Sequence, residues 1–137
     1  MYLVAQLFSS RLLVFASFVL LCGGASMAKS LDLYGDAVRS VEVSLGGAWI
    51  LHVLVASSLG FIAAWSTPKL YYQCGRFVLS PWVFLLLAMV SADELLQMFN
   101  PLRHFSVVDL SINLTCVTFG ALAYVTFLKS PFGDSSV

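Results

Sequence analysis

Residues 43–68 read VSLGGAWILHVLVASSLGFIAAWSTP and contain no Asp, Glu, Lys or Arg. A helix that crosses the hydrocarbon core of a bilayer needs about 20 mostly apolar residues. This run of 26 residues is long enough to supply one. It therefore predicts a membrane-spanning helix, which we place at about residues 46–65.

Three further uncharged runs flank this one, with 17 residues at 12–28, 16 at 77–92 and 19 at 110–128. They predict spans at about residues 8–28, 79–99 and 107–128. The third span reaches a sufficient length only if it includes Asp93 and Glu94. We therefore predict an all-α fold, an integral membrane four-helix bundle, with residues 1–137 as a single transmembrane domain.

The composition of the whole chain agrees with a lipid environment. Only 10% of the 137 residues are charged and 60% are hydrophobic, whereas about 25% of residues are charged in typical soluble domains. A soluble domain of this size exposes much of its chain and needs more charge to cover its surface. The net charge of zero provides no basic surface, so nucleic acid is not expected as a partner.

Two other sets of residues predict packing rather than chemistry. Small side chains at Ala56, Gly60 and Ala64 lie on one face of the second span, a pattern typical of close helix contacts in membranes. The cysteines are far apart and form no ligand-spaced motif, which predicts free thiols and no metal site or other cofactor; they are Cys22, Cys74 and Cys116.

Helix-capping residues agree with the predicted span ends. Ser80 precedes Pro81, an N-cap followed by proline at the first helical position. Asn100-Pro101 is expected to end the third span. Ser106 and Asp109 have the spacing of a capping box at the start of the fourth.

The first span has two interpretations. An apolar run that follows Arg11 and ends in Ser26-Met27-Ala28 is typical of a cleaved signal peptide, but it also fits a retained helix, which we favour. With four spans, an N-terminus in the cytoplasm places four basic residues inside and three outside. The positive-inside rule then favours cytoplasmic N- and C-termini.

In this orientation, polar residues from three helices and one loop share the outer half of the bilayer: His52, Asp93, Glu94, Gln97, Arg103, Asp109 and Asn113. Asp93 and Glu94 lie about 18–20 Å along a core of about 30 Å, at about 1.5 Å per residue. Gln97 follows these acids by four and three residues, so it is expected near both on the helix surface.

The two adjacent acids are costly in this position. An ionised side chain deep in a bilayer costs at least ~2.5–3.5 kcal/mol, and the C-terminal end of a helix disfavours negative charge. A cation must compensate, or one carboxyl must be protonated. Arg103 is the nearest permanent cation, and its planar guanidinium suits a carboxylate.

Several of these residues also have a structural interpretation. Asp109 would cap its helix, and Asn113 and Gln97 would form interhelical hydrogen bonds. His52 would be a packed histidine, and Arg103 a structural ion-pair partner. The adjacent acids fit a structural role least well, because hydrogen bonding between helices rarely requires two acids in hydrocarbon.

Residues 93–120 resemble the hallmark of the VanZ-like family of small bacterial membrane proteins, at Asp93, Glu94, Gln97, Phe99, Pro101, Arg103, Ser106, Asp109, Asn113 and Gly120. His52 is similar to the histidine near the start of that family's second helix. Ala48 and Trp49 stand where the family commonly has Asp-Lys, and Cys116 where glycine is usual.

The resemblance implies a multi-pass protein of the bacterial inner membrane with a role in the cell envelope. The family is named for a protein linked to low-level resistance to the glycopeptide teicoplanin. An accessory or binding protein is the function we expect, with its outer polar site on membrane lipids, an envelope glycolipid or glycopeptide, or a larger membrane complex. The alternatives are an intramembrane acid–base enzyme on a lipid-linked substrate and a proton-linked transporter unit.

Overall fold

The structure is a computed structural model that describes residues 10–31, 33, 35–74, 78–101 and 104–129. Four long helices make up most of the described chain: α2 (Ser10–Ser30), α4 (Ala48–Ser66), α6 (Pro81–Leu96) and α7 (Val107–Lys129). A 3-10 turn, η1 (Gln97–Phe99), continues α6. The four segments are long and apolar enough to cross a membrane, so the predicted four-helix membrane protein is confirmed. Their described ends agree with the predicted ones to within two residues.

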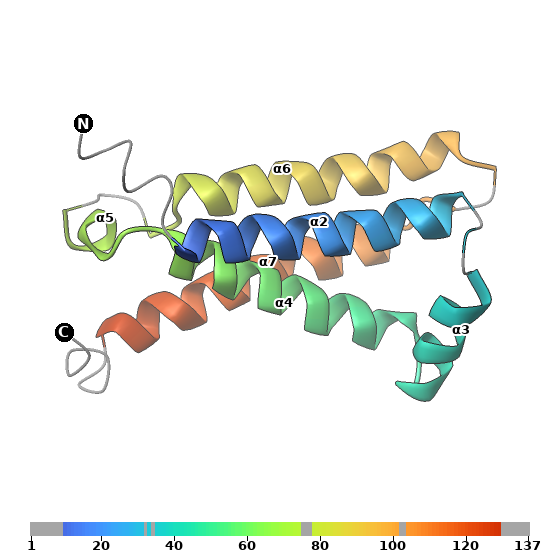
Figure 1. Ribbon diagram of the computed structural model, residues 1–137, viewed down its shortest axis with the longest axis horizontal. Coiled ribbons are helices and arrows are strands. Elements are labelled where there is room, and N and C mark those ends of the chain that lie inside the picture. The colour runs from blue at the N-terminus through green and yellow to red at the C-terminus, as the bar shows by residue number, and fades with distance from the viewer. Residues whose placement is uncertain (1–9, 32, 34, 75–77, 102–103, 130–137) are drawn as a thin grey trace.

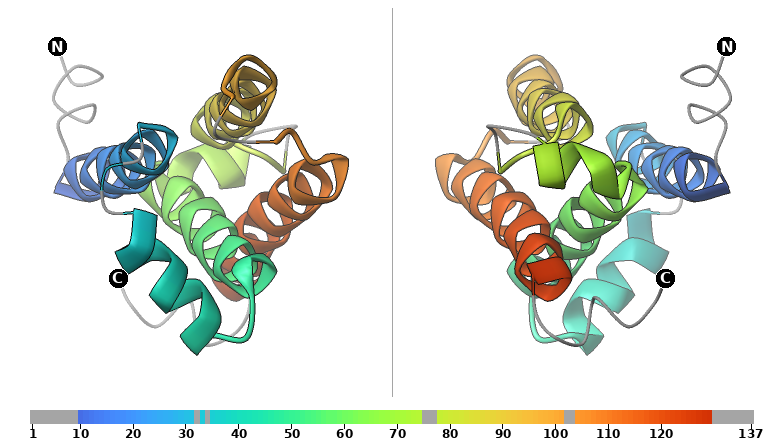
Figure 2. Two further views of the ribbon diagram at one scale, coloured as in Figure 1. Left: turned by 90° about the vertical axis from the view of Figure 1, so that its right-hand side faces the viewer. Right: turned by 90° about the vertical axis from the view of Figure 1, so that its left-hand side faces the viewer.

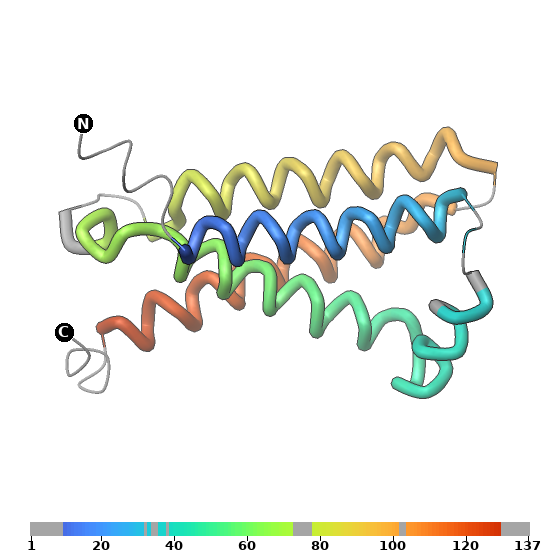
Figure 3. Tube along the Cα trace, in the orientation of Figure 1, coloured from blue at the N-terminus to red at the C-terminus, as the bar shows by residue number. Residues whose placement is uncertain are grey.

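The long helices run antiparallel, one after another along the chain (Figures 1 and 3). Ser10 and Lys129, the first and last described residues, therefore lie at the same end of the bundle. The short helix α5 (Lys69–Cys74) lies at this end too, which we call the terminal end. A second short helix, α3 (Gly35–Ser44), marks the opposite end, the α3 end. Neither short helix was predicted.

Helix α4 lies between α2 and α7 and packs most closely with α7, as the end views in Figure 2 show. The closest approach of α4 and α7 lies at two glycines. A Cβ atom on Gly60 would lie 2.0 Å from the Val117 carbonyl oxygen, and one on Gly120 would lie 2.0 Å from that of Ser57. Only glycine permits backbones to approach this closely. The small-residue face predicted around Gly60 is therefore the contact with α7.

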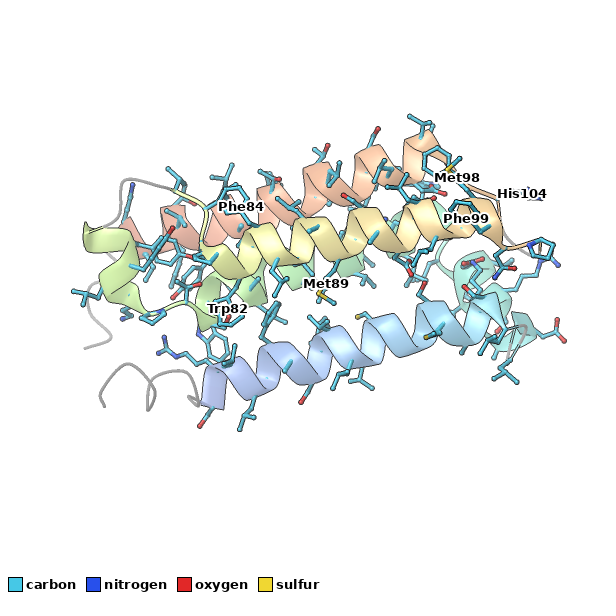
Figure 4. All side chains as sticks on the ribbon, turned by 90° about the horizontal axis from the view of Figure 1, so that it is seen from above. Trp82, Phe84, Met89, Met98, Phe99 and His104 are labelled. Carbon is cyan, nitrogen blue, oxygen red and sulfur yellow. The ribbon has the colours of Figure 1, made fainter. Side chains whose placement is uncertain are left out.

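The other two long helices pack on the outside of this pair. Phe15 of α2 is buried and contacts Trp82 of α6, with ring centroids 6.4 Å apart. Figure 4 shows Trp82 and Met89 on the side of α6 toward α2. Through Phe15, α2 therefore contributes to the hydrophobic core of the bundle.

The surface of the bundle is apolar along its length. Large hydrophobic side chains of three different long helices are exposed, with Leu20 75%, Phe84 53% and Phe119 67% accessible. Contiguous exposed apolar surface of this extent marks contact with lipid or protein. Together with the span lengths, it identifies a multi-pass membrane protein whose outer surface faces hydrocarbon.

The boundaries of α6 follow the predicted capping. The Ser80 hydroxyl accepts a hydrogen bond from the backbone N–H of Val83 at 3.4 Å, and Pro81 occupies the first turn. At the other end, Asn100 leaves the helical conformation with φ −103° and ψ 118°. Pro101 follows, and a proline disfavours the helical conformation of the residue before it. These boundaries fix the height of Asp93 and Glu94 within the bundle.

Candidate functional site

Glu94 is the most deeply buried acid among the described residues, with 2% of its surface exposed. Its Oε1 accepts a hydrogen bond from the backbone N–H of Ser106 at 3.1 Å, and its Oε2 accepts one from Gln97 Nε2 at 3.3 Å. Ser106 immediately precedes α7, so the carboxylate lies at a helix N-terminus. That end carries a partial positive charge and unpaired N–H groups. The start of α7 therefore supplies part of the compensation that the sequence led us to expect from a cation.

Asp93 has a different environment, because adjacent helical residues point about 100° apart around the axis. It is exposed, and its carboxylate accepts a hydrogen bond from the Ser26 hydroxyl of α2, at 2.8 Å to Oδ2 and 3.1 Å to Oδ1. Asp93 thus lies on the surface of the bundle, whereas Glu94 is enclosed between helices, and the predicted depth of both acids in the bilayer stays a prediction. Glu94 faces α7 and the interior, whereas Asp93 faces α2 and remains accessible.

Gln97 joins the two acids. Its side-chain Nε2 lies 3.4 Å from Asp93 Oδ2 and 3.3 Å from Glu94 Oε2, and the residue is buried. The contacts confirm that the i+3 and i+4 spacing brings Gln97 near both acids. One amide group thus provides donors to two carboxylates, which fixes their relative position.

The last turn of α2 is attached to the same region. Asn100 Nδ2 donates to the Ser30 carbonyl oxygen at 2.9 Å, and the Ser30 hydroxyl donates to the Ser26 carbonyl oxygen at 3.0 Å. Sequence reasoning missed Ser26 and Ser30 as part of the site. The signal was present in two serines in the last turn of an apolar helix, but Ser26 was interpreted as part of a possible cleavage motif.

We define the polar cluster by the residues that these hydrogen bonds connect: Ser26, Ser30, Asp93, Glu94, Gln97, Asn100 and Ser106. They come from α2, α6, η1 and the start of α7, all at the α3 end of the bundle. Figure 4 shows Met98, Phe99 and His104 at this same end. The cluster combines one exposed carboxylate with one buried carboxylate, each held by hydroxyl, amide or backbone donors.

For three of the predicted site residues, no described hydrogen bond joins the side chain to the cluster. His52 on α4, and Asp109 and Asn113 on α7, are all half-buried. Within the described part of the chain, no hydrogen bond or ion pair connects their side chains to the cluster. The backbone N–H of Asp109 donates to the Ser106 hydroxyl at 3.2 Å, so Ser106 is the predicted N-cap of α7. Arg103 lies outside the described residues.

One hydrogen bond of the predicted capping box, the one to the N–H of Ser106, is made by a residue of another helix. In a capping box the acid at the third helical position binds the N–H of the cap residue, which would pair Asp109 with Ser106. In the structure the Ser106 N–H is bound by Glu94 from α6 instead. The cap of α7 is therefore shared between its own serine and the acid of a neighbouring helix.

A second group of buried and half-buried hydroxyls lies at the terminal end, where each donates to a backbone carbonyl of α4. Ser66 and Thr67 both donate to the Ala63 carbonyl oxygen, and Tyr72 donates to that of Ala64 at 3.0 Å. Burial raises the pKa of the Tyr72 phenol above its ordinary value, although hydrogen bonds with Thr67 and Ser80 act in the opposite direction. These groups hold the turn from α4 to α6, so we regard them as structural.

The residues available for other chemistry are few. Cys22 and Cys116 are free thiols on separate helices, and the Cys74 side chain lies outside the described set. Among the described residues, no group of three or more His, Cys, Asp or Glu side chains has the arrangement of a metal site. The polar cluster is therefore the candidate site that the described residues support.

Comparison with family models, curated proteins and solved structures finds no match for this chain. The relation to the VanZ-like family therefore stays a prediction that rests on the motif in residues 93–120.

Proposed function

We propose that this chain is a VanZ-like accessory protein of the bacterial inner membrane. In this proposal the polar cluster lies toward the outer face and binds the polar headgroup of an envelope lipid, glycolipid or glycopeptide. The proposal combines the sequence motif with a membrane-spanning bundle whose polar cluster lies at one end.

The proposal rests on the hydrogen bonds and the exposure of the Asp93 carboxylate. Its carboxylate is held by Ser26 and Gln97, yet it is exposed. An ionised carboxylate can accept about four hydrogen bonds. Among the described residues, Ser26 and Gln97 are the donors to Asp93, which leaves acceptor capacity on an exposed, positioned group. Hydroxyl and ammonium groups are the donors that complement it. Sugar and amine-bearing headgroups supply both.

The position in the bundle favours a ligand that is itself anchored in the membrane. The cluster lies near the ends of three membrane-spanning helices, and the headgroup of a lipid-linked molecule lies near the same level of a bilayer. Such a molecule reaches the cluster by lateral diffusion, without leaving the membrane. A larger membrane complex presents equivalent groups if the partner is a protein.

The orientation follows from the basic residues. The terminal end carries Arg11, Lys69 and Lys129 among the described residues, and both described chain ends lie there. Four basic residues would lie at that end against three at the α3 end, so the positive-inside rule favours a cytoplasmic terminal end. Both termini are then cytoplasmic, and the cluster faces outward.

Acid–base catalysis or proton transfer is the alternative use of the acids, and the two hydrogen bonds of Glu94 limit it. Each oxygen of Glu94 already accepts a hydrogen bond from a group that maintains the fold. Glu94 is therefore better placed to hold α7 than to exchange protons with a substrate. A catalytic or relay role would depend on Asp93.

Native mass spectrometry of the protein purified with its own lipids tests the proposal. The wild type is expected to retain a molecule with hydroxyl or amine groups, and Asp93→Asn is expected to lose most of it. Asp109→Asn is the matched control, since no hydrogen bond within the described part of the chain joins its carboxylate to the cluster, and it should retain the molecule. Equal retention by Asp93→Asn and the wild type would refute the proposed role of Asp93. In cells, the same variants are compared for sensitivity to a glycopeptide.

A further inference from the structure

The short helix α3 has two different faces. Ala37, Val41 and Leu45 recur at every fourth position, so they line one side of the helix and its C-cap. All three are exposed. The opposite side carries Asp36 and Arg39, with Val43 between them. The helix is therefore amphipathic, and its apolar side is not covered by the described bundle.

The orientation of α3 is fixed at its C-terminal end. Gly46 adopts φ +90°, and its N–H donates to the Val43 carbonyl oxygen at 3.1 Å. The N–H of Gly47 donates to the Glu42 carbonyl oxygen at 2.8 Å. This pair of hydrogen bonds is a Schellman motif with glycine at the left-handed position. It sets the direction in which the chain enters α4.

A second attachment ties α3 to α2. Lys29, in the last turn of α2, forms an ion pair with Glu42 of α3. The Leu33 N–H also donates to the Ala28 carbonyl oxygen at 2.8 Å, which ends α2 tightly. With both of its neighbours attached in this way, α3 runs across the end of the bundle rather than along it (Figure 1). In a membrane-spanning bundle that direction lies near the plane of the bilayer.

The residues before and after α3 indicate its depth relative to the bilayer. Leu31 and Leu33 precede it and Trp49 follows it in the first turn of α4, and all three are exposed. Tryptophan is enriched at the boundary between hydrocarbon and headgroups. The exposed apolar side of α3 is thus continuous in sequence with the lipid-facing ends of two membrane-spanning helices.

We propose that α3 is an interfacial helix that lies in the bilayer surface, with Ala37, Val41 and Leu45 inserted among the lipids and Asp36 and Arg39 toward water. The occupant of this apolar face is the membrane itself. Helices of this type bury their apolar side roughly 5–10 Å into the headgroup and acyl boundary. Because α3 contains one basic and two acidic residues, its attachment depends on apolar contact and not on anionic lipid.

The two valines provide a matched pair for the test. Val41 and Val43 are the same residue type on one helix, two positions and therefore about 200° apart. Each is replaced by cysteine in a cysteine-free background and spin-labelled in phosphatidylcholine nanodiscs. We expect the label at 41 to have a severalfold higher ratio of oxygen to nickel-chelate accessibility than the label at 43. The difference should persist when anionic lipid is added.

Other outcomes contradict the proposal. Equal, high nickel-chelate accessibility at both positions would place α3 in water. Low accessibility to both reagents at 41 would show that protein, such as a second copy of the chain, covers this face. If the cysteine-free protein does not fold, Val41→Trp and Val43→Trp in the otherwise unchanged chain give the same contrast. Brominated lipid should then quench the added tryptophan at 41 and not the one at 43, and the reverse or equal quenching would overturn the assignment.

Discussion

The Glu94 carboxylate accepts a hydrogen bond from the backbone N–H of Ser106 at 3.1 Å. The contact joins the end of α6 to the start of α7 and places a negative charge where the α7 dipole favours it. The Ser106 hydroxyl in turn accepts from the Asp109 N–H. Two donors at the start of α7 are therefore satisfied by residues of two different helices.

Removal of the Glu94 carboxylate should destabilise the protein. Glu94→Ala leaves the half-buried Ser106 N–H without its acceptor and the Gln97 amide with Asp93 alone, which costs about 1–3 kcal/mol for the Ser106 N–H. Glu94→Gln keeps one acceptor oxygen and should cost less. Thermal unfolding in detergent measures the stability of both variants. Asp109→Asn is the control, with an expected loss of about 0.3–1 kcal/mol from the helix dipole. If Glu94→Ala unfolds at the wild-type temperature, the shared cap does not contribute to stability.

The crossing of α4 and α7 should tolerate no added methyl group. In Gly60→Ala or Gly120→Ala the new Cβ meets a backbone carbonyl of the opposite helix at about 2 Å. Overpacking costs roughly 1–3 kcal/mol when neighbours adjust, and a backbone adjusts less readily than a side chain. Gly24→Ala is the control, because nothing lies within 4 Å of its Cβ position. In detergent, the thermal unfolding temperature of Gly24→Ala should equal or exceed that of the wild type. The unfolding temperatures of Gly60→Ala and Gly120→Ala should lie well below it. Equal stability of all three variants would contradict the close approach.

The long helices could be predicted from sequence because hydrocarbon imposes one length on every span. The same is true of the local caps, such as Ser80 and Ser106, whose partners lie within three residues. The position of Gln97 beside both acids also followed from helical spacing alone. Each of these features depends on neighbours in the chain.

The features that sequence reasoning missed depend on tertiary placement. Which of two adjacent acids is buried follows from the rotation of α6 about its axis, and the uniformly apolar sequence does not specify that rotation. The pairing of Ser26 with Asp93 spans 67 positions. Helices α3 and α5 were missed because they are short and contain none of the long apolar runs on which the prediction relied.

The two described chain ends lie on one side of the bundle, which makes the topology testable. If the terminal end is cytoplasmic, alkaline phosphatase fused after residue 137 should be inactive, since it folds only outside the cytoplasm. The same reporter inserted after Ser40, in α3, should be active. An active C-terminal fusion would reverse the proposed orientation and place the polar cluster on the cytoplasmic side.

The cysteines should be dispensable. Cys22 and Cys116 are free and on different helices, and both behave as small hydrophobic residues in this position. Replacement of all three cysteines by Ala or Ser should leave the yield and the helical circular dichroism nearly unchanged. A folded wild type under oxidising conditions, together with an unfolded triple variant, would indicate a disulfide instead.

The central claim is that the polar cluster is a binding site and not only part of the architecture. The double isostere Asp93→Asn with Glu94→Gln removes both charges and keeps the shapes and one acceptor oxygen of each side chain. The most direct test is native mass spectrometry of this variant, purified with its own lipids beside the wild type and checked for folding by thermal unfolding. We expect a folded protein that has lost the molecule which the wild type retains. A folded double isostere that retains the same molecule to the same extent would contradict the claim and leave the two acids a structural role alone.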